Sequence, residues 1–231
     1  MKEILISIQP KWCELIASGK KTVEVRKTKP KIETPFKCYI YCTKAKEHFS
    51  IGGGVYAAND VLYRLPTGDI KFGDSFELMG NWSGQYNDNN FFNGKVIGEF
   101  TCDWIQEYKC EFVDDDCYEY IVSDDYDDDE DPTGTVEWSN DSGIPYVGTE
   151  FYKKCCVSYT ELKKYMGVGF GTFYGWHISD LVIYEQPKEL SEFRKYISFL
   201  EDESISELEE TGMNNIRLKR PPQSWCYVMK G

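Results

Sequence analysis

The order of hydrophobic and polar residues predicts a strand followed by a short helix at the start of the chain. Residues 4–9 form an aliphatic run that is typical of a buried strand. Pro10 then stands where a helix can begin. Trp12, Leu15 and Ile16 recur at the spacing of one helical face, so we expect this face to pack against the rest of the protein.

Further strands are predicted wherever apolar and polar residues alternate. Gly19 suits the end of the first helix, because glycine adopts left-handed backbone geometry without steric cost. Gly98 lies inside a predicted strand, which indicates a bulge or a close approach of two backbones. The segments that we expect to be strands are 22–27, 37–43, 95–102, 174–184 and 225–228.

Two helices are predicted in the C-terminal half of the chain. Ser158 and Glu161 have the spacing of a capping box, so a helix begins there and ends at Gly167. The charged residues 194–212 also indicate a helix. The sequence contains no internal repeat, βαβ pattern or second independent core. We therefore expect one mostly β, α+β domain over residues 1–231.

Polar chemistry is concentrated in the stretch Gly-Lys-Lys-Thr-Val-Glu-Val-Arg that follows the first helix. Side chains alternate along a strand, so Thr22, Glu24 and Arg26 share one face and the valines between them face a core. Lys20 and Lys21 lie at the mouth of this strand. The cluster is either a solvated strand face with an ordinary ion pair or a ligand site built on a rigid element.

The spacing Gly-x-Lys-x-x-Glu-x-Arg resembles the signature of the ASCH domains of the PUA-like superfamily. The resemblance covers residues 1–46, 94–106 and 158–229, through the opening strand and helix, the phrase GKVIGEF and the closing PPQSW. It implies a small β-barrel of five or six strands with two or three flanking helices, and a final strand beside the first. Residues 47–93 and 107–157 are then long insertions.

The net charge of −13 is unevenly distributed along the chain. Residues 103–141 hold 16 Asp and Glu against one Lys, whereas residues 1–46 hold 11 Lys and Arg against four Glu. A basic part can meet phosphates on an acidic protein, because electrostatic fields decay within about 8–10 Å at physiological salt. We expect weak binding, or binding of a short ligand.

The resemblance implies that the protein binds RNA, a modified nucleobase or a nucleotide in a cleft around the motif. Lys21 and Arg26 would hold a phosphate or a base carbonyl, with Lys20 beside them. Glu24 would accept from an exocyclic amine or orient Arg26. Both cations should then be accessible to solvent. Arg26→Ala and Lys21→Ala should abolish ligand binding with little loss of stability.

Two aromatic residues are candidates for stacking on a base. Each stacked base contributes about 1–3 kcal/mol in single-strand binding proteins. Tyr41 and Trp225 are the candidates, and packing in the core is the alternative for both.

A second interpretation is a small hydrolase, because some short ASCH proteins resembling this one are amidohydrolases and others are described as ribonucleases. Lys21 matches the amidohydrolase lysine, but Glu24 stands where that group has Thr, and Thr22 is out of step. A lysine activates a nucleophile only if its pKa is lowered, which Lys20 and Arg26 favour and Glu24 opposes. A water activated by Glu24 is another route. Whether the protein is an enzyme stays open.

A third interpretation is a protein-interaction role for the acidic insertion, which includes residues 124–131, and for the aromatic-rich loop 81–93. The acidic run lacks the spacing of a calcium-binding loop. Larger ASCH proteins of this type resemble products of phages or mobile elements of Firmicutes, which would suit a regulatory role.

The remaining composition narrows the class of protein. No run of 18 apolar residues is present, so we expect no membrane span. Nine cysteines at irregular positions do not form a disulfide framework, which favours a cytoplasmic, reduced protein. His48 and His177 are far apart and the cysteines lack zinc spacing, so we expect no metal or other cofactor.

Overall fold

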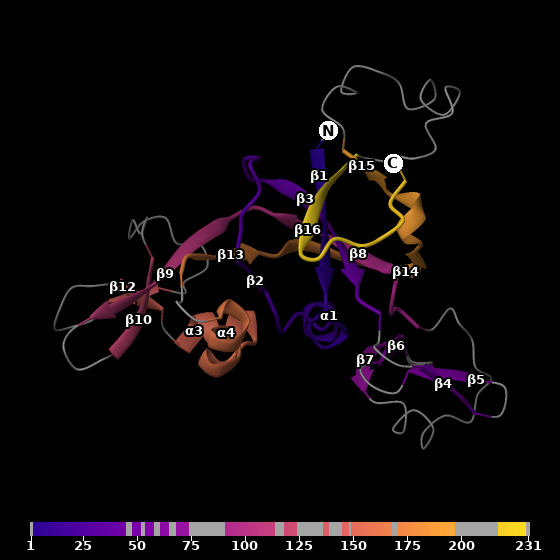
Figure 1. Cartoon of the computed structure of the whole chain (residues 1–231), viewed down its shortest axis with the longest axis horizontal. Coiled ribbons are helices and arrows are strands. Elements are labelled where there is room, and N and C mark those ends of the chain that lie inside the picture. Colours follow the sequence, from indigo (N-terminus) through magenta and orange to yellow (C-terminus); the bar gives the residue numbers. More distant parts are fainter. Residues whose placement is uncertain are drawn as a thin grey trace. The chain divides into compact units, whose positions relative to one another are not determined.

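The computed structural model of the chain forms two compact units (Figure 1). Unit 1 comprises Met1–Ala17, Lys37–Phe100 and Leu181–Gly231, and unit 2 comprises Ser18–Phe36 and Thr101–Asp180. The structure describes residues 2–44, 48–51, 54–57, 61–64, 68–73, 91–113, 118–123, 136–138, 145–147, 149–167, 171–196 and 217–229. The single domain expected from the sequence stays a prediction.

Unit 1 is built on a six-stranded mixed sheet with the strand order β14-β8-β3-β1-β16-β15. Two hairpins, β4 with β5 and β6 with β7, and the helix α1 complete the unit. The elements are β1 (Lys2–Ile8), α1 (Pro10–Ala17), β3 (Phe36–Cys42), β4 (His48–Ile51), β5 (Gly54–Ala57), β6 (Val61–Arg64), β7 (Ile70–Gly73), β8 (Val96–Cys102), β14 (Ser179–Lys188), the 3-10 turn η2 (Leu190–Glu192), β15 (Arg194–Lys195) and β16 (Trp225–Met229).

The strand β1 is a central strand of this sheet. It pairs in parallel with β3 and antiparallel with β16, so the predicted return of the last strand beside the first is confirmed. Residues 3–8 are all buried, as expected for a strand that is covered on both faces. One face packs on a hydrophobic cluster made by Leu5, Tyr39, Tyr41, Val96, Phe193, Leu218 and Val228.

Unit 2 contains a four-stranded sheet with the order β10-β9-β13-β2, a hairpin of β11 with β12, and two short helices. The predicted capping box is present, because Ser158 and Glu161 bond reciprocally and the helix ends at Gly167 with φ of 92°. The elements are β2 (Val23–Arg26), β9 (Ile105–Val113), β10 (Tyr118–Ser123), β11 (Val136–Trp138), β12 (Pro145–Val147), α3 (Thr149–Cys155), α4 (Tyr159–Met166) and β13 (Phe173–His177).

The mostly β, α+β class is confirmed, while several finer expectations need correction. The described strands form open sheets, and no closed barrel is found among them. The α1 helix begins at Pro10, but it buries Cys13 and Ile16 and leaves Trp12 and Leu15 partly exposed. The predicted buried face was therefore wrong by one position. Cys13 rather than Trp12 is buried, because a free cysteine packs as a small apolar residue.

Two other segment predictions were wrong. The strand expected over 174–184 is two strands, β13 and β14, which belong to different sheets. Ile178 separates the two strands, and Asp180 near the start of β14 has a φ of 46°, in the left-handed region that aspartate tolerates better than most residues. Arg194 and Lys195 form a strand rather than the start of a helix, because they pair with β16. Residues 197–212 of that predicted helix, and the acidic run 124–131, lie outside the described residues.

No helix in the described part of the chain is long and apolar enough to cross a membrane.

Gly98 provides a test of the sheet in unit 1. A Cβ atom at Gly98 would stand 2.4 Å from the backbone oxygen of Val182, so the predicted close approach of two backbones is confirmed. Gly98→Ala should therefore lower the free energy of unfolding by about 1–3 kcal/mol, the usual cost of overpacking. Gly175→Ala is the matched control in unit 2, because its Cβ would meet only side chains, of Tyr108 and Val23, at 3.0 Å. Urea denaturation should show the larger loss for Gly98→Ala, and equal losses would contradict the assignment.

Candidate functional site

The residues of the predicted site fall into both units. Lys20, Lys21, Thr22, Glu24 and Arg26 belong to unit 2, at and before β2. The two predicted stacking residues, Tyr41 and Trp225, belong to unit 1. The structure thus brings the charged motif together, but it does not place the two aromatic residues in the same unit.

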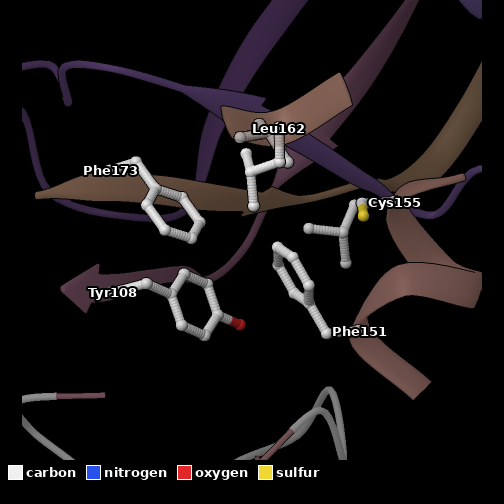
Figure 2. Packing of buried hydrophobic residues seen from close by; sticks show 7 residues of the cluster. Tyr108, Phe151, Cys155, Leu162 and Phe173 are labelled. Atoms are coloured by element: carbon white, nitrogen blue, oxygen red, sulfur yellow. The ribbon is translucent and has the colours of Figure 1, made fainter. Parts of the chain in front are cut away.

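The strand β2 takes its position from its two valines. Val23 and Val25 are buried in an aromatic cluster with Tyr108, Phe151 and Phe173, as predicted from the alternation (Figure 2). The Tyr108 ring stacks on Phe173 with centroids 5.1 Å apart and lies 4.8 Å from Phe151. The other members are Cys155 and Leu162. Because the valines face this core, Glu24 and Arg26 must point to the opposite side of the strand.

Lys21 has a buried ammonium group with a complete set of acceptors. Its side chain is 2 % exposed. The Nζ atom donates to the carbonyl oxygens of Val23 at 2.9 Å and of Cys155 at 2.6 Å, and it lies 3.2 Å from Oε2 of Glu24. An ammonium carries three protons, and these three acceptors match them. The expected solvent accessibility of Lys21 is therefore wrong.

The physical reason for this burial is the end of helix α3. The last carbonyls of a helix lack partners within the helix and carry partial negative charge. Cys155 is the last residue of α3, and its carbonyl accepts from Lys21. The neighbouring Lys154 carbonyl accepts from the backbone N–H of Thr22 at 2.8 Å. The motif thus caps α3 and ties it to β2.

Glu24 lies between the two cations of the motif. Its Oε1 atom is 2.8 Å from Nη2 of Arg26, and its Oε2 atom is 3.2 Å from Nζ of Lys21. The predicted side-by-side arrangement of Glu24 and Arg26 is confirmed. The expected accessibility of Arg26 is wrong, since the residue is only 6 % exposed. Removing one partner from such a buried network leaves another charge uncompensated.

The accessible groups next to this network are Lys20, Lys27 and Tyr165, of which only Lys20 was predicted. The ammonium of Lys27 lies 5.1 Å from the centre of the Tyr165 ring and donates to the Met166 carbonyl at 3.2 Å. Tyr165, at the end of α4, is 42 % exposed. Partial burial raises the pKa of its hydroxyl, while the positive charge of Arg26 opposes that rise. Sequence reasoning missed Tyr165 because only tertiary packing brings α4 to β2.

The geometry gives little support to catalysis by Lys21. Its Nζ atom is buried and surrounded by three acceptors of the protein, whereas a nucleophile or base must reach the substrate. Among the described residues, no hydrogen bond joins the Thr22 hydroxyl to Lys21 or Glu24. The catalytic roles of Lys21, Thr22 and Glu24 stay predictions.

No group of three metal-binding side chains is found in the part of the chain that the structure describes. His177 instead pairs with Asp103, with Nδ1 2.7 Å from Oδ1. The hydrogen bond from His177 lowers the pKa of Asp103, although partial burial acts in the opposite direction.

The two predicted stacking residues differ in exposure. Tyr41 is only 1 % exposed and packs in the unit 1 core, so its ring offers no face to a base. Trp225 is partly exposed, and its ring lies 5.4 Å from that of Tyr227. Tyr41 is therefore a core residue, and Trp225 stays a candidate for stacking on a base.

Lys21 and Lys20 form a natural pair for testing the buried network. Lys21→Met should lower the free energy of unfolding by about 3–5 kcal/mol, because two carbonyls and Glu24 lose a buried cation. Lys20→Met, at the exposed neighbouring position, should change it by less than about 0.5 kcal/mol. Urea denaturation of both variants measures the difference. A small loss for Lys21→Met would show that the ammonium is not a structural group.

A comparison with protein families agrees with the family resemblance of the motif. Residues 6–83 match the family model of the ASCH domain. This match runs through residues 47–83, which the sequence analysis assigned to an insertion. No curated protein matches the chain.

Solved structures of an ASCH protein from Zymomonas mobilis also resemble the chain. The protein titled ASCH is 18 % identical, with a TM-score of 0.41 over 99 % of this chain and 88 % of that chain. Two single-substitution variants of the same protein, ZmASCH, are 17 % and 16 % identical, each with a TM-score of 0.42. They cover 92 % and 89 % of their own chains, and 100 % and 99 % of this one. The sequence similarity to the ASCH domain family therefore lies in residues 6–83, which contain the motif.

Proposed function

We propose that the protein binds single-stranded RNA or a nucleotide-sized ligand beside the motif strand of unit 2. The observation that carries this proposal is the exposed Tyr165 ring, which is flanked by Lys27 and by the buried Arg26. Single-strand binding proteins combine aromatic faces, on which bases stack, with cations that meet the phosphates. The ASCH match supports this ligand class, because ASCH domains are generally related to RNA.

The buried motif has a positioning role in this proposal. Lys21 and Glu24 hold β2 against the end of α3, and Arg26 carries its positive charge beside the Tyr165 hydroxyl. Lys27 follows directly on β2 and projects into solvent. The buried ion network would fix the positions of both contact groups. Tyr165 would contact a base, and Lys27 would contact a phosphate. Such preorganisation reduces the entropy lost on binding.

Calorimetric titration of the full chain with pentauridylate and with UMP tests this site. Tyr165→Leu should raise Kd for pentauridylate by about 5- to 150-fold, the equivalent of about 1–3 kcal/mol for one stacked base. Lys27→Gln should weaken binding and reduce the slope of log K against log salt by about 0.7, the value for one phosphate contact on a single strand.

Lys188→Gln is the matched control for Lys27→Gln. Lys188 is also exposed and also lies over a tyrosine ring, that of Tyr184, at 4.6 Å, but it belongs to unit 1. The control should leave the affinity unchanged. Equal losses in the two lysine variants would indicate general charge attraction, and unchanged affinity in Tyr165→Leu and Lys27→Gln would remove the proposed site.

A further inference from the structure

In unit 1 the strand β16 pairs with β1 on one side and with β15 on the other (Figure 1). A second group of aromatic and basic side chains belongs to these strands and their neighbours. The register places Ile6 opposite Trp225, Ile4 opposite Tyr227 and Lys2 opposite Met229. Residues two apart on a strand, and residues directly opposite on paired strands, share a face of the sheet. We call this surface the C-terminal patch, and its members are Lys2, Arg194, Tyr196, Arg217, Trp225 and Tyr227.

The rings of the C-terminal patch are in contact with one another. The centroids of Trp225 and Tyr227 are 5.4 Å apart at an interplanar angle of 76°, and those of Tyr196 and Tyr227 are 6.2 Å apart at 64°. All three rings are partly exposed, whereas Tyr39 and Tyr41 on the other face of the sheet are buried. The C-terminal patch therefore offers exposed aromatic surface to a ligand, whereas Tyr39 and Tyr41 do not.

A cation already occupies the edge of this aromatic surface. The ammonium of Lys2 lies 4.2 Å from the centre of the Tyr196 ring and 5.3 Å from that of Tyr227. Aromatic faces attract cations, so the Lys2 ammonium remains beside the rings. Its positive charge then lies next to any group that stacks on them. A ligand that carries both flat rings and negative charge fits such an arrangement.

The arginines of the patch strengthen the case for an anion. Arg194 and Arg217 are directly opposite one another in an antiparallel bridge. A phosphate that meets both guanidinium groups would form charge-assisted hydrogen bonds with each of them. Arg217 is exposed, and one of its nitrogens donates to the Ser191 carbonyl at 3.3 Å. In sequence, residues 217–231 hold four Lys and Arg and no acidic residue, although the whole chain has a net charge of −13.

We propose that the C-terminal patch binds a single-stranded nucleic acid, with bases stacked on Trp225 and the two tyrosines and phosphates at Arg194 and Arg217. Duplex is excluded as the preferred ligand because its bases are stacked on one another and do not offer their faces. This inference shares its ligand class with the proposed function in unit 2 but uses different residues, so either site can fail alone.

Fluorescence anisotropy of labelled decauridylate with the full chain tests the patch. Tyr196→Leu and Trp225→Leu should each raise Kd by about 5- to 150-fold. Arg217→Gln should lower the slope of log K against log salt by about 0.7. Lys188→Gln again removes one exposed charge from unit 1 and should leave Kd unchanged. Unlabelled duplex RNA of the same length should compete poorly.

The outcomes separate the two sites. If Trp225→Leu disturbs β16, the other two variants decide whether the patch binds. These are Arg217→Gln, at an exposed residue, and Tyr196→Leu, directly after β15. Unchanged binding in both of these variants overturns the patch, and equal competition by duplex overturns the stacking mode. Losses confined to the Tyr165 and Lys27 variants support the site in unit 2 and reject the patch. Losses confined to the patch variants do the reverse, and absence of binding by the unmodified chain overturns both.

Discussion

The buried ammonium of Lys21 is the interaction on which unit 2 depends most directly. A charge that leaves water loses several kcal/mol of solvation, which only close and well-directed partners can replace. Here two backbone carbonyls and Glu24 provide them, all within 3.2 Å. One of the carbonyls closes helix α3, so the same ammonium that satisfies Glu24 also joins a helix to the edge of a sheet. The charged motif therefore has a structural role in unit 2.

The position of β2 explains why so many charges are tolerated there. Among the described strands, β2 is the last in its sheet, with β13 on one side only. An open edge exposes backbone groups that can pair with other chains, and natural proteins cover or charge such edges. The end of α3 covers this edge through the bond between Thr22 and Lys154, and Lys21 reinforces the contact. Glu24 then neutralises one of two cations, so the buried network carries a single positive charge overall, directed towards Tyr165 through Arg26.

The sequence predicted those features that local rules decide. The alternation of Val23 and Val25, the helix start at Pro10 and the capping box at Ser158 depend only on near neighbours. The burial of Lys21 depends on Cys155, 134 residues away, which no local pattern reveals. The break between β13 and β14 falls at Ile178 rather than at a Gly or Pro, which usually mark such a break, so one strand was predicted where two exist. Tyr41 and Trp225 both belong to predicted strands, but Tyr41 lies on the central strand β3 and is buried, whereas Trp225 lies on β16 near the edge of the sheet and is partly exposed.

The kind of ligand that suits this protein follows from the ranges of the forces involved. Long-range attraction of a polyanion is opposed by the acidic residues, since the whole chain carries a net charge of −13. Stacking acts only at contact and is insensitive to net charge, and a cation beside a ring acts within a Debye length of about 8 Å. Tyr165 with Lys27, and Tyr227 with Lys2, are pairs of this short-range kind. If the two proposed sites bind nucleic acid, these pairs would favour short, unpaired ligands whose bases can reach the rings over extended duplexes.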